Sequence, residues 1–209
     1  LLGIVDDKEN DATTESAEIT NSTSVMMTTV QGNDNAIGYV SLGSLSDSVK
    51  EVTVDGVEGT AENVKTGKYK ISRPFNLCYY DGKLSKLAED LINFIMSDEG
   101  QKTVDKEGYI SVESGKSYKA SGLKGKITVA GSTSVAPLMN VIADEYKKLN
   151  PGVTIEIQES GSTAGIQSAT EKAVDIGMSS RELKDDEAKT LATKKIAMDG
   201  IAVIVNKNN

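Results

Sequence analysis

The sequence contains no histidine and no tryptophan, and its only cysteine is Cys78. Without histidine, Ser-His and Cys-His nucleophilic machinery is excluded, and one cysteine allows neither an internal disulfide nor an ordinary zinc site. A P-loop lysine motif and a paired-carboxylate metal cluster are also missing, which disfavours a phosphatase or a kinase. The acidic pairs Asp6-Asp7 and Asp185-Asp186 are interpreted as solvated charges. We therefore expect no enzymatic activity, no metal and no cofactor.

Long apolar runs and clustered positive charge are missing as well. No apolar run approaches the ~20 residues that span a bilayer, and no signal peptide precedes the opening Leu1-Leu2-Gly3, which favours a mature or processed form. The 209 residues carry a net charge of −8, which argues against a nucleic-acid partner. A small anion remains compatible, because a local site of hydroxyls, backbone amides and one arginine does not depend on net charge.

Regular alternation of strands and helices begins near Lys126. The patterns predict strands at 127–130, 153–157, 175–178 and 196–205, with helices at 134–149, 162–173 and 185–192. They also predict strands at 36–40, 50–57 and 68–72, helices at 84–96 and 97–104, and a loop or frayed helix at 5–24. The composition at 111–125 shifts to Ser, Gly, Lys and Tyr, which indicates a linker. This alternation predicts an α/β fold with a mixed, mostly parallel sheet flanked by helices.

Three strand-to-helix junctions are rich in small hydroxyl residues: GSTSVAP at 131–137, SGSTAG at 160–165 and GMSSR at 177–181. In a parallel sheet these loops leave the same edge, at the carboxyl ends of the strands. A helix N-terminus exposes unpaired N–H groups, Ser and Thr add hydroxyl donors, and Gly allows close approach of the backbone. Arg181 would add a planar charged fork that suits a tetrahedral oxyanion. Each loop alone is explained by helix capping, and Arg181 alone by a surface charge, but three such loops together favour an anion site.

These motifs resemble those of the phosphate-binding protein of the bacterial phosphate ABC importer, the PstS family. The segments at 199–206, 36–43 and 69–75 resemble further strands of that family. The resemblance implies a type II periplasmic-binding-protein fold, in which two lobes close over the ligand. It further implies that phosphate is bound by Thr133, Ser134, Ser162, Ser180 and Arg181, and is passed to a membrane permease by a periplasmic or cell-surface protein, lipid-anchored in some parents. The proton acceptor for hydrogen phosphate stays unassigned, because Ser179-Ser180-Arg181 stands where some members have an aspartate.

Two departures from the family pattern matter. The order of segments is that of a circular permutation, or of a fragment cut from a tandem repeat. It consists of a remnant of the second lobe at 1–45, the carboxyl-terminal part of the first lobe at 46–110, the 111–125 linker joining old termini, and the amino-terminal part of the first lobe at 126–209. A stretch of the second lobe that clamps phosphate from the opposite side has no match, so we expect one face of the ligand to stay wet and affinity to be weakened. The alternative is an engineered or fragment scaffold without a working site, which self-associates or pairs with the missing lobe.

Overall fold

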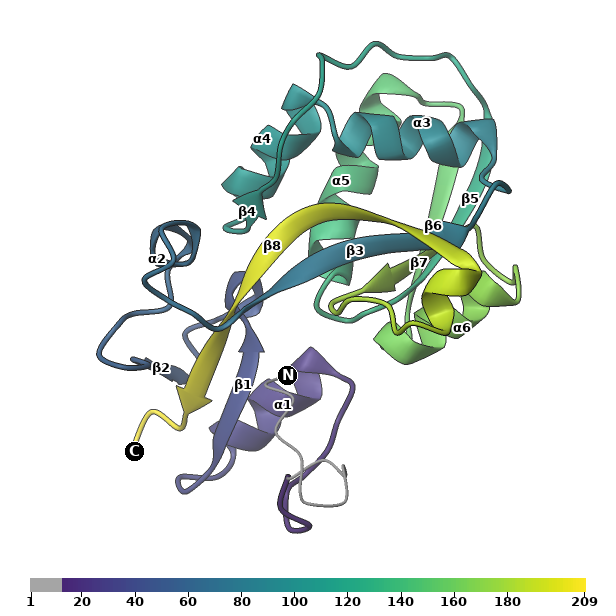
Figure 1. Cartoon of the computed structure of the whole chain (residues 1–209). Coiled ribbons are helices and arrows are strands. Elements are labelled where there is room, and N and C mark those ends of the chain that lie inside the picture. The colour runs from purple at the N-terminus through teal and green to yellow at the C-terminus, as the bar shows by residue number, and fades with distance from the viewer. Residues whose placement is uncertain (1–12) are drawn as a thin grey trace.

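The computed structural model describes residues 13–209 and is built around one curled sheet flanked by helices (Figure 1). The sheet has the strand order β1-β8-β3-β7-β5-β6, with β2 and β4 also paired to β8. The strands are β1 (Ile37–Ser41), β2 (Lys50–Val52), β3 (Ser72–Tyr80), β4 (Ile110–Ser111), β5 (Gly125–Gly131), β6 (Val153–Glu159), β7 (Ile176–Ser179) and β8 (Leu191–Val205). The helices are α1 (Thr23–Gln31), α2 (Ala61–Lys65), α3 (Lys86–Ile95), α4 (Asp98–Lys106), α5 (Ala136–Leu149) and α6 (Ser162–Thr170). The predicted α/β fold is therefore confirmed.

The parallel part of the sheet consists of β5 with β6 on one side and β7 on the other. β7 and the second half of β5 are largely buried, whereas β6 is an edge strand in which only Val153 is buried. α5 packs against this part of the sheet with a face that includes Leu138 and Ile142, both fully buried. Proline at the start of α5 has no N–H to lose from the first turn, which makes Pro137 a favourable residue there. Since β5, β6 and β7 run in the same direction, the loops that follow them leave the same edge of the sheet, as the sequence predicts.

The remainder of the sheet is antiparallel, so the sheet is mixed, as the sequence predicts, but it is not mostly parallel. β8 pairs antiparallel with β1, β2, β3 and β4, and β3 pairs antiparallel with β7. The strand predicted at 68–72 is wrong, because β3 starts only at Ser72 and runs through Pro74 to Tyr80. Proline fits there because β7 pairs only with residues 76–78, which leaves one edge of β3 unpaired at Pro74.

A second, smaller apolar cluster lies where α1 and β1 pack on the end of β8. Val30 of α1, Val40 of β1 and Ile204 of β8 are buried in it. The sequence did not predict α1, although its N-cap Ser22 accepts a hydrogen bond from the Val25 amide. Figure 1 shows α1 and β1 beside one end of β8, apart from the layers formed by α3, α5 and α6. Part of the predicted 5–24 segment, residues 5–12, lies outside the described residues.

The helix predicted at 185–192 is wrong. Only a 3₁₀ turn forms at Glu187–Lys189, and β8 begins two residues later at Leu191, opposite Tyr80 of β3. Burial of Leu191 against the sheet wins over the weak local preference for helix. None of the helices within residues 13–209 is both long enough and apolar enough to cross a membrane.

Candidate anion-binding site

The three hydroxyl-rich loops meet at a cavity of about 240 Å³ at the carboxyl edge of β5, β6 and β7. Thr133 and Ser134 reach it from the first loop, Ser162 from the second and Ser180 from the third. Ser162 and Ser180 touch directly, with their hydroxyl oxygens 3.3 Å apart, and the Ser180 amide donates to the Ser162 hydroxyl at 3.1 Å. Four of the five residues that the sequence predicted for the site are thus brought together.

Glycines let the three loops approach one another this closely. Gly131 ends β5 with a φ of 142°, in the region that favours glycine, and a Cβ there would collide with the Met178 backbone. Its carbonyl accepts the amides of Ser160 and Gly161, which links the first loop to the second. Gly165 lies on the α6 face that packs against β5, where a Cβ would come within 2.6 Å of the Ala130 carbonyl oxygen. Close packing, rather than contact with a ligand, therefore explains Gly165 in the SGSTAG motif.

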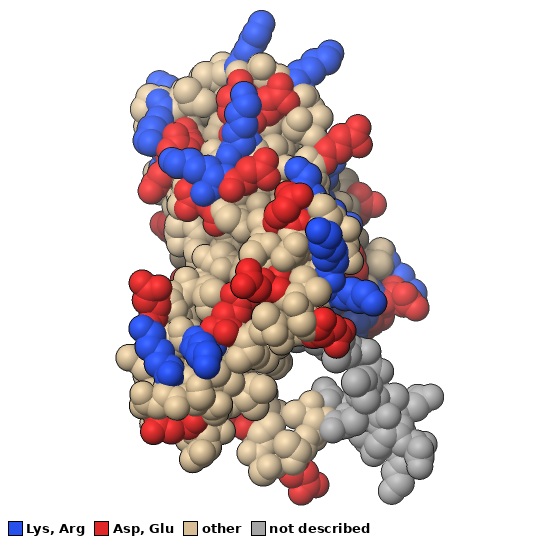
Figure 2. Space-filling view, turned by 90° about the vertical axis from the view of Figure 1, so that its left-hand side faces the viewer, with Lys and Arg blue, Asp and Glu red and all other residues tan. Residues whose placement is uncertain are grey.

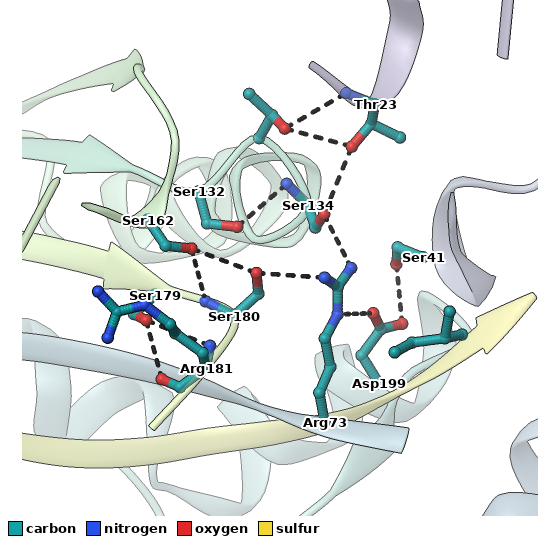
Figure 3. Close-up of polar contacts among 12 residues, drawn as sticks. Thr23, Ser41, Arg73, Ser132, Ser134, Ser162, Ser179, Ser180, Arg181 and Asp199 are labelled. Carbon is teal, nitrogen blue, oxygen red and sulfur yellow. Dashed lines mark hydrogen bonds and ion pairs between the residues drawn. The ribbon is translucent and has the colours of Figure 1, made fainter. Parts of the chain in front are cut away.

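The cation of the site is Arg73, which reaches the cavity from β3. Its two terminal nitrogens donate to the hydroxyls of Ser134, at 2.9 Å, and Ser180, at 3.3 Å (Figure 3). Its Nε pairs with the fully buried carboxylate of Asp199 on β8 at 3.1 Å, and Ser41 of β1 donates to the other oxygen of that carboxylate at 2.8 Å. Arg73 therefore points a fixed guanidinium fork at two of the predicted donors.

Burial and pairing shift the pKa of the Asp199 carboxyl in opposite directions. Burial raises the pKa of the Asp199 carboxyl to about 6, and the charge of Arg73 and the hydrogen bond from Ser41 partly offset that increase. A buried carboxylate in an apolar strand requires a partner. Sequence reasoning missed Arg73 as a site residue, although an aspartate within the apolar run of β8 was a signal that a cation lies nearby.

Arg181 does not face this cavity, contrary to the sequence-based expectation. Its guanidinium makes a two-point ion pair with Glu187, at 2.7 and 2.8 Å, and this pairing raises the pKa of Arg181 above its ordinary value. In Figure 3 its terminal nitrogens point away from Arg73 and Ser134. The residue lines a neighbouring cavity of about 700 Å³ instead. The Glu187 carboxylate, six residues farther along the chain, binds the Arg181 guanidinium and so holds it away from the anion cavity.

A further part of the cavity lining is supplied by residues 20–23, immediately before and at the start of α1. The Thr133 hydroxyl donates to the Asn21 carbonyl oxygen at 2.9 Å, and the Asn21 side chain donates to the Ser160 carbonyl oxygen at 3.4 Å. The sequence indicated that this side of the ligand would be open. Within the described residues, a polar segment occupies it.

The chemistry of the lining suits binding of an oxyanion without reaction. Its polar side chains are hydroxyls and one amide around one arginine, and no carboxylate lines this cavity within residues 13–209. No group of three His, Cys, Asp or Glu in the same part of the chain could hold a metal ion. On the face seen in Figure 2, acidic and basic side chains are interspersed. Among the described residues that line the cavity, Arg73 is the one charged residue, and although it is paired with Asp199, its terminal N–H groups are suitable donors for an anion.

Comparison with known proteins identifies the family of the chain. Residues 116–209 match the model of a PBP superfamily domain. The chain is 49% identical over 200 residues to phosphate-binding protein PstS 2 of Streptococcus agalactiae, covering 95% of this chain and 68% of the relative. It also resembles the crystal structure of a phosphate-binding protein of a phosphate ABC transporter from Streptococcus pneumoniae, with a TM-score of 0.73 and 48% identity over 93% of this chain and 76% of the other.

A more distant relative, phosphate-binding protein PstS of Pseudomonas aeruginosa, is 37% identical over 99 residues, covering 44% of this chain and 31% of the relative. All three relatives are binding proteins by name rather than enzymes, in agreement with the missing catalytic machinery. Identity near one half along almost the whole chain, together with the shared fold, shows that this chain belongs to the PstS family of phosphate-binding proteins.

Proposed function

We propose that this chain binds inorganic phosphate non-covalently, as the solute-binding component of a phosphate ABC importer. The observation that carries the proposal is the convergence of Thr133, Ser134, Ser162 and Ser180 on one cavity around the Arg73 fork. The phosphate-binding relatives named above support the choice of phosphate among tetrahedral oxyanions.

The cavity would hold phosphate through hydrogen bonds from the Arg73 guanidinium and the hydroxyl groups around it. Arg73 now donates to the hydroxyls of Ser134 and Ser180, so each hydroxyl keeps its own proton free to turn toward an oxyanion in the cavity. Hydrogen bonds to a charged group contribute about 1.5–3 kcal/mol each. The helix that starts at Ser162 adds the partial positive charge of its N-terminus. Arg181 as a direct ligand is a prediction from the sequence alone, and the ion pair that holds its guanidinium on Glu187 counts against it.

The partners and location follow from the same proposal. A solute-binding protein delivers its ligand to the membrane permease of the importer, so we place the chain outside the cytoplasm, at the periplasm or cell surface. The same proposal includes a lipid anchor that attaches the full-length protein to the membrane. We also retain the expectation that affinity is lower than in the two-lobed family pattern, because fewer donors surround the ligand.

We further propose that the order of segments is rotated relative to part of the family, with boundaries at 1–45, 46–110, 111–125 and 126–209. Similarity to the S. agalactiae relative runs through 95% of this chain, whereas the P. aeruginosa relative matches 44% of it. A rotated order shared with the streptococcal relative would produce this contrast, because a protein of the other order aligns with one side of the linker only. The superfamily match starts at residue 116, within the 111–125 linker, which also supports the proposal.

Isothermal titration calorimetry with phosphate and with sulfate tests the function. We expect saturable phosphate binding, and at least a tenfold weaker association for Ser134→Ala and for Ser162→Ala, at about 1.5 kcal/mol per lost bond. The matched control is Ser168→Ala, farther along α6 and outside the cavity lining, which should bind like the wild type. Absence of heat with phosphate at millimolar concentrations would reject the proposal.

The alternative, a scaffold without a working site, has one observation in its favour. Ile37 and Tyr39 on β1 and Val25 on α1 are 71%, 52% and 50% exposed, so this end of the molecule presents apolar side chains to solvent. Light scattering after size exclusion distinguishes the two hypotheses. A dimer that binds no phosphate would favour the scaffold, and a monomer that binds phosphate would exclude it.

A further inference from the structure

The first residue of α1, Thr23, touches both predicted donors of the first loop. Its hydroxyl lies 3.2 Å from the Thr133 hydroxyl and 3.4 Å from the Ser134 hydroxyl, and its amide donates to the Thr133 hydroxyl at 3.4 Å (Figure 3). These residues are 110 and 111 positions apart along the chain. Thr23 is therefore brought to the cavity by the packing of α1 rather than by the neighbouring sequence.

We propose that Thr23 is a phosphate-binding residue, which donates its hydroxyl hydrogen bond from the start of α1. This inference rests on the proposed function and assigns a further part of the same site. It changes the expectation drawn from the sequence, that the far side of the ligand stays wet.

The hydroxyl contacts of Thr23 with the first loop are weak enough to be exchanged for contacts with an anion. Oxygen-to-oxygen distances of 3.2 and 3.4 Å are long for hydroxyl hydrogen bonds, whose usual distance is about 2.7–2.8 Å. A hydrogen bond to a charged oxygen is shorter and roughly twice as strong as a neutral one. Phosphate in the cavity would therefore gain more from the Thr23 hydroxyl than Thr133 and Ser134 would lose.

Charge and position support the same assignment. The first turn of α1 has no acidic residue, so nothing there cancels the positive end of the nine-residue helix. Ser22 caps the helix through the Val25 amide, which leaves Thr23 facing the cavity. Arg73 also bonds Ser134, so Thr23 and Arg73 meet the same hydroxyl from two directions.

Calorimetric titration of the full chain with inorganic phosphate tests Thr23. Thr23→Val keeps the shape of the side chain and removes the hydroxyl, and we expect it to bind phosphate about tenfold to a hundredfold more weakly. Thr23→Ser keeps the hydroxyl and should stay within about threefold of the wild type. The matched control is Thr28→Val on the same helix, because Thr28 is exposed and bonds the Ser24 carbonyl away from the cavity. All variants should melt at the wild-type temperature without phosphate.

The outcomes separate this inference from the function on which it rests. If the wild type binds phosphate and Ser134→Ala weakens it, but Thr23→Val binds like the wild type, the role of Thr23 is overturned and the function stands. If Thr23→Ser is as weak as Thr23→Val, keeping the hydroxyl does not preserve binding, and the assignment is again wrong. If the wild type does not bind phosphate at all, both fail.

Discussion

At the scale of single residues, Asp199 predicts a measurable dependence of stability on pH. Burial raises its pKa from 3.8 to about 6, so between roughly pH 4 and 6 the folded protein binds this proton more tightly than the unfolded chain. The contribution of Asp199 to stability is therefore greatest at low pH and falls as pH rises through that window, by about 3 kcal/mol in total. Urea unfolding of the wild type and of Asp199→Asn at a series of pH values measures it.

The expected result is a difference in slope. The free energy of unfolding of the wild type should fall relative to that of Asp199→Asn between pH 4 and 6, and the two curves should run parallel above pH 7. Asp34→Asn, a substitution on an exposed loop before β1, serves as the control and should follow the wild type. Curves for Asp199→Asn and wild type that stay parallel throughout would mean that Asp199 keeps an ordinary pKa.

The two arginines give a second prediction at this scale. Arg73→Gln removes the fork that bonds Ser134 and Ser180, so phosphate affinity should fall at least tenfold, at about 1.5–3 kcal/mol per charge-assisted bond. Arg181→Gln removes a fork held by Glu187 and should change affinity by less than about threefold. Calorimetry with phosphate compares them, and a loss with Arg181→Gln as large as with Arg73→Gln would restore Arg181 as a ligand.

The limits of sequence reasoning are clearest at these same residues. Ser162 and Ser180 could be predicted because each follows a buried strand, and parallel strands bring such loops to one edge. Arg73 could not be placed, because its position depends on a ladder with Asp199, 126 residues away. Arg181 was expected in the cradle because the sequence does not reveal that Glu187 folds back on it within a single turn.

At the scale of elements, the packing of α6 on β5 predicts the effect of Gly165→Ala. A Cβ at Gly165 would lie 2.6 Å from the Ala130 carbonyl oxygen, and backbone on both sides leaves no flexible side chain to move aside. Overpacking of this kind costs about 1–3 kcal/mol, and it would push Ser162 away from Ser180. We expect lower unfolding free energy and weaker phosphate binding together, measured by urea denaturation and calorimetry.

A control substitution at a loosely packed glycine distinguishes the effect of close packing from the effect of replacing any glycine by alanine. Gly32, the C-cap of α1, has a φ of −85°, and its nearest contact to an added Cβ is the Thr28 carbonyl oxygen at 3.3 Å. Gly32→Ala should therefore leave both measurements close to the wild type. Equal losses in the two variants would contradict the packing argument.

Helices and strands whose buried residues recur with the period of that element in the sequence were predicted well. The run from β5 to β7 was found within a few residues at each boundary, because apolar strands alternate with one-faced helices there. The strand predicted at 68–72 and the helix predicted at 185–192 were wrong, because the pairing between β3 and β8 overrides the local sequence preferences. α1 was missed because its pattern is weak and its burial depends on β1 and β8.

At the scale of the whole molecule, the two sides of the 111–125 linker are held together by the sheet rather than by the linker. β3, from before the linker, lies between β7 and β8, from after it, with a ladder that runs from Ser72 to Tyr80. The linker itself is fastened at Asp90, whose carboxylate accepts the hydroxyls of Tyr118 and Ser121 at 2.6 and 2.9 Å. If this segment joins old termini, as the proposed rotation has it, its covalent continuity is dispensable once the protein has folded.

Cutting the linker tests that idea. A short protease site inserted after Gly115 and cleaved in the folded protein should leave two fragments that co-elute in size exclusion, because separating them would require breaking the β3 ladders on both sides. Phosphate affinity should stay within about threefold of the uncut insertion variant, because Arg73 and the hydroxyl loops keep their neighbours. The cut protein should be more sensitive to dilution in urea, since its unfolding releases two chains. Fragments that part without denaturant would show that the linker is structural and would count against a joint between old termini.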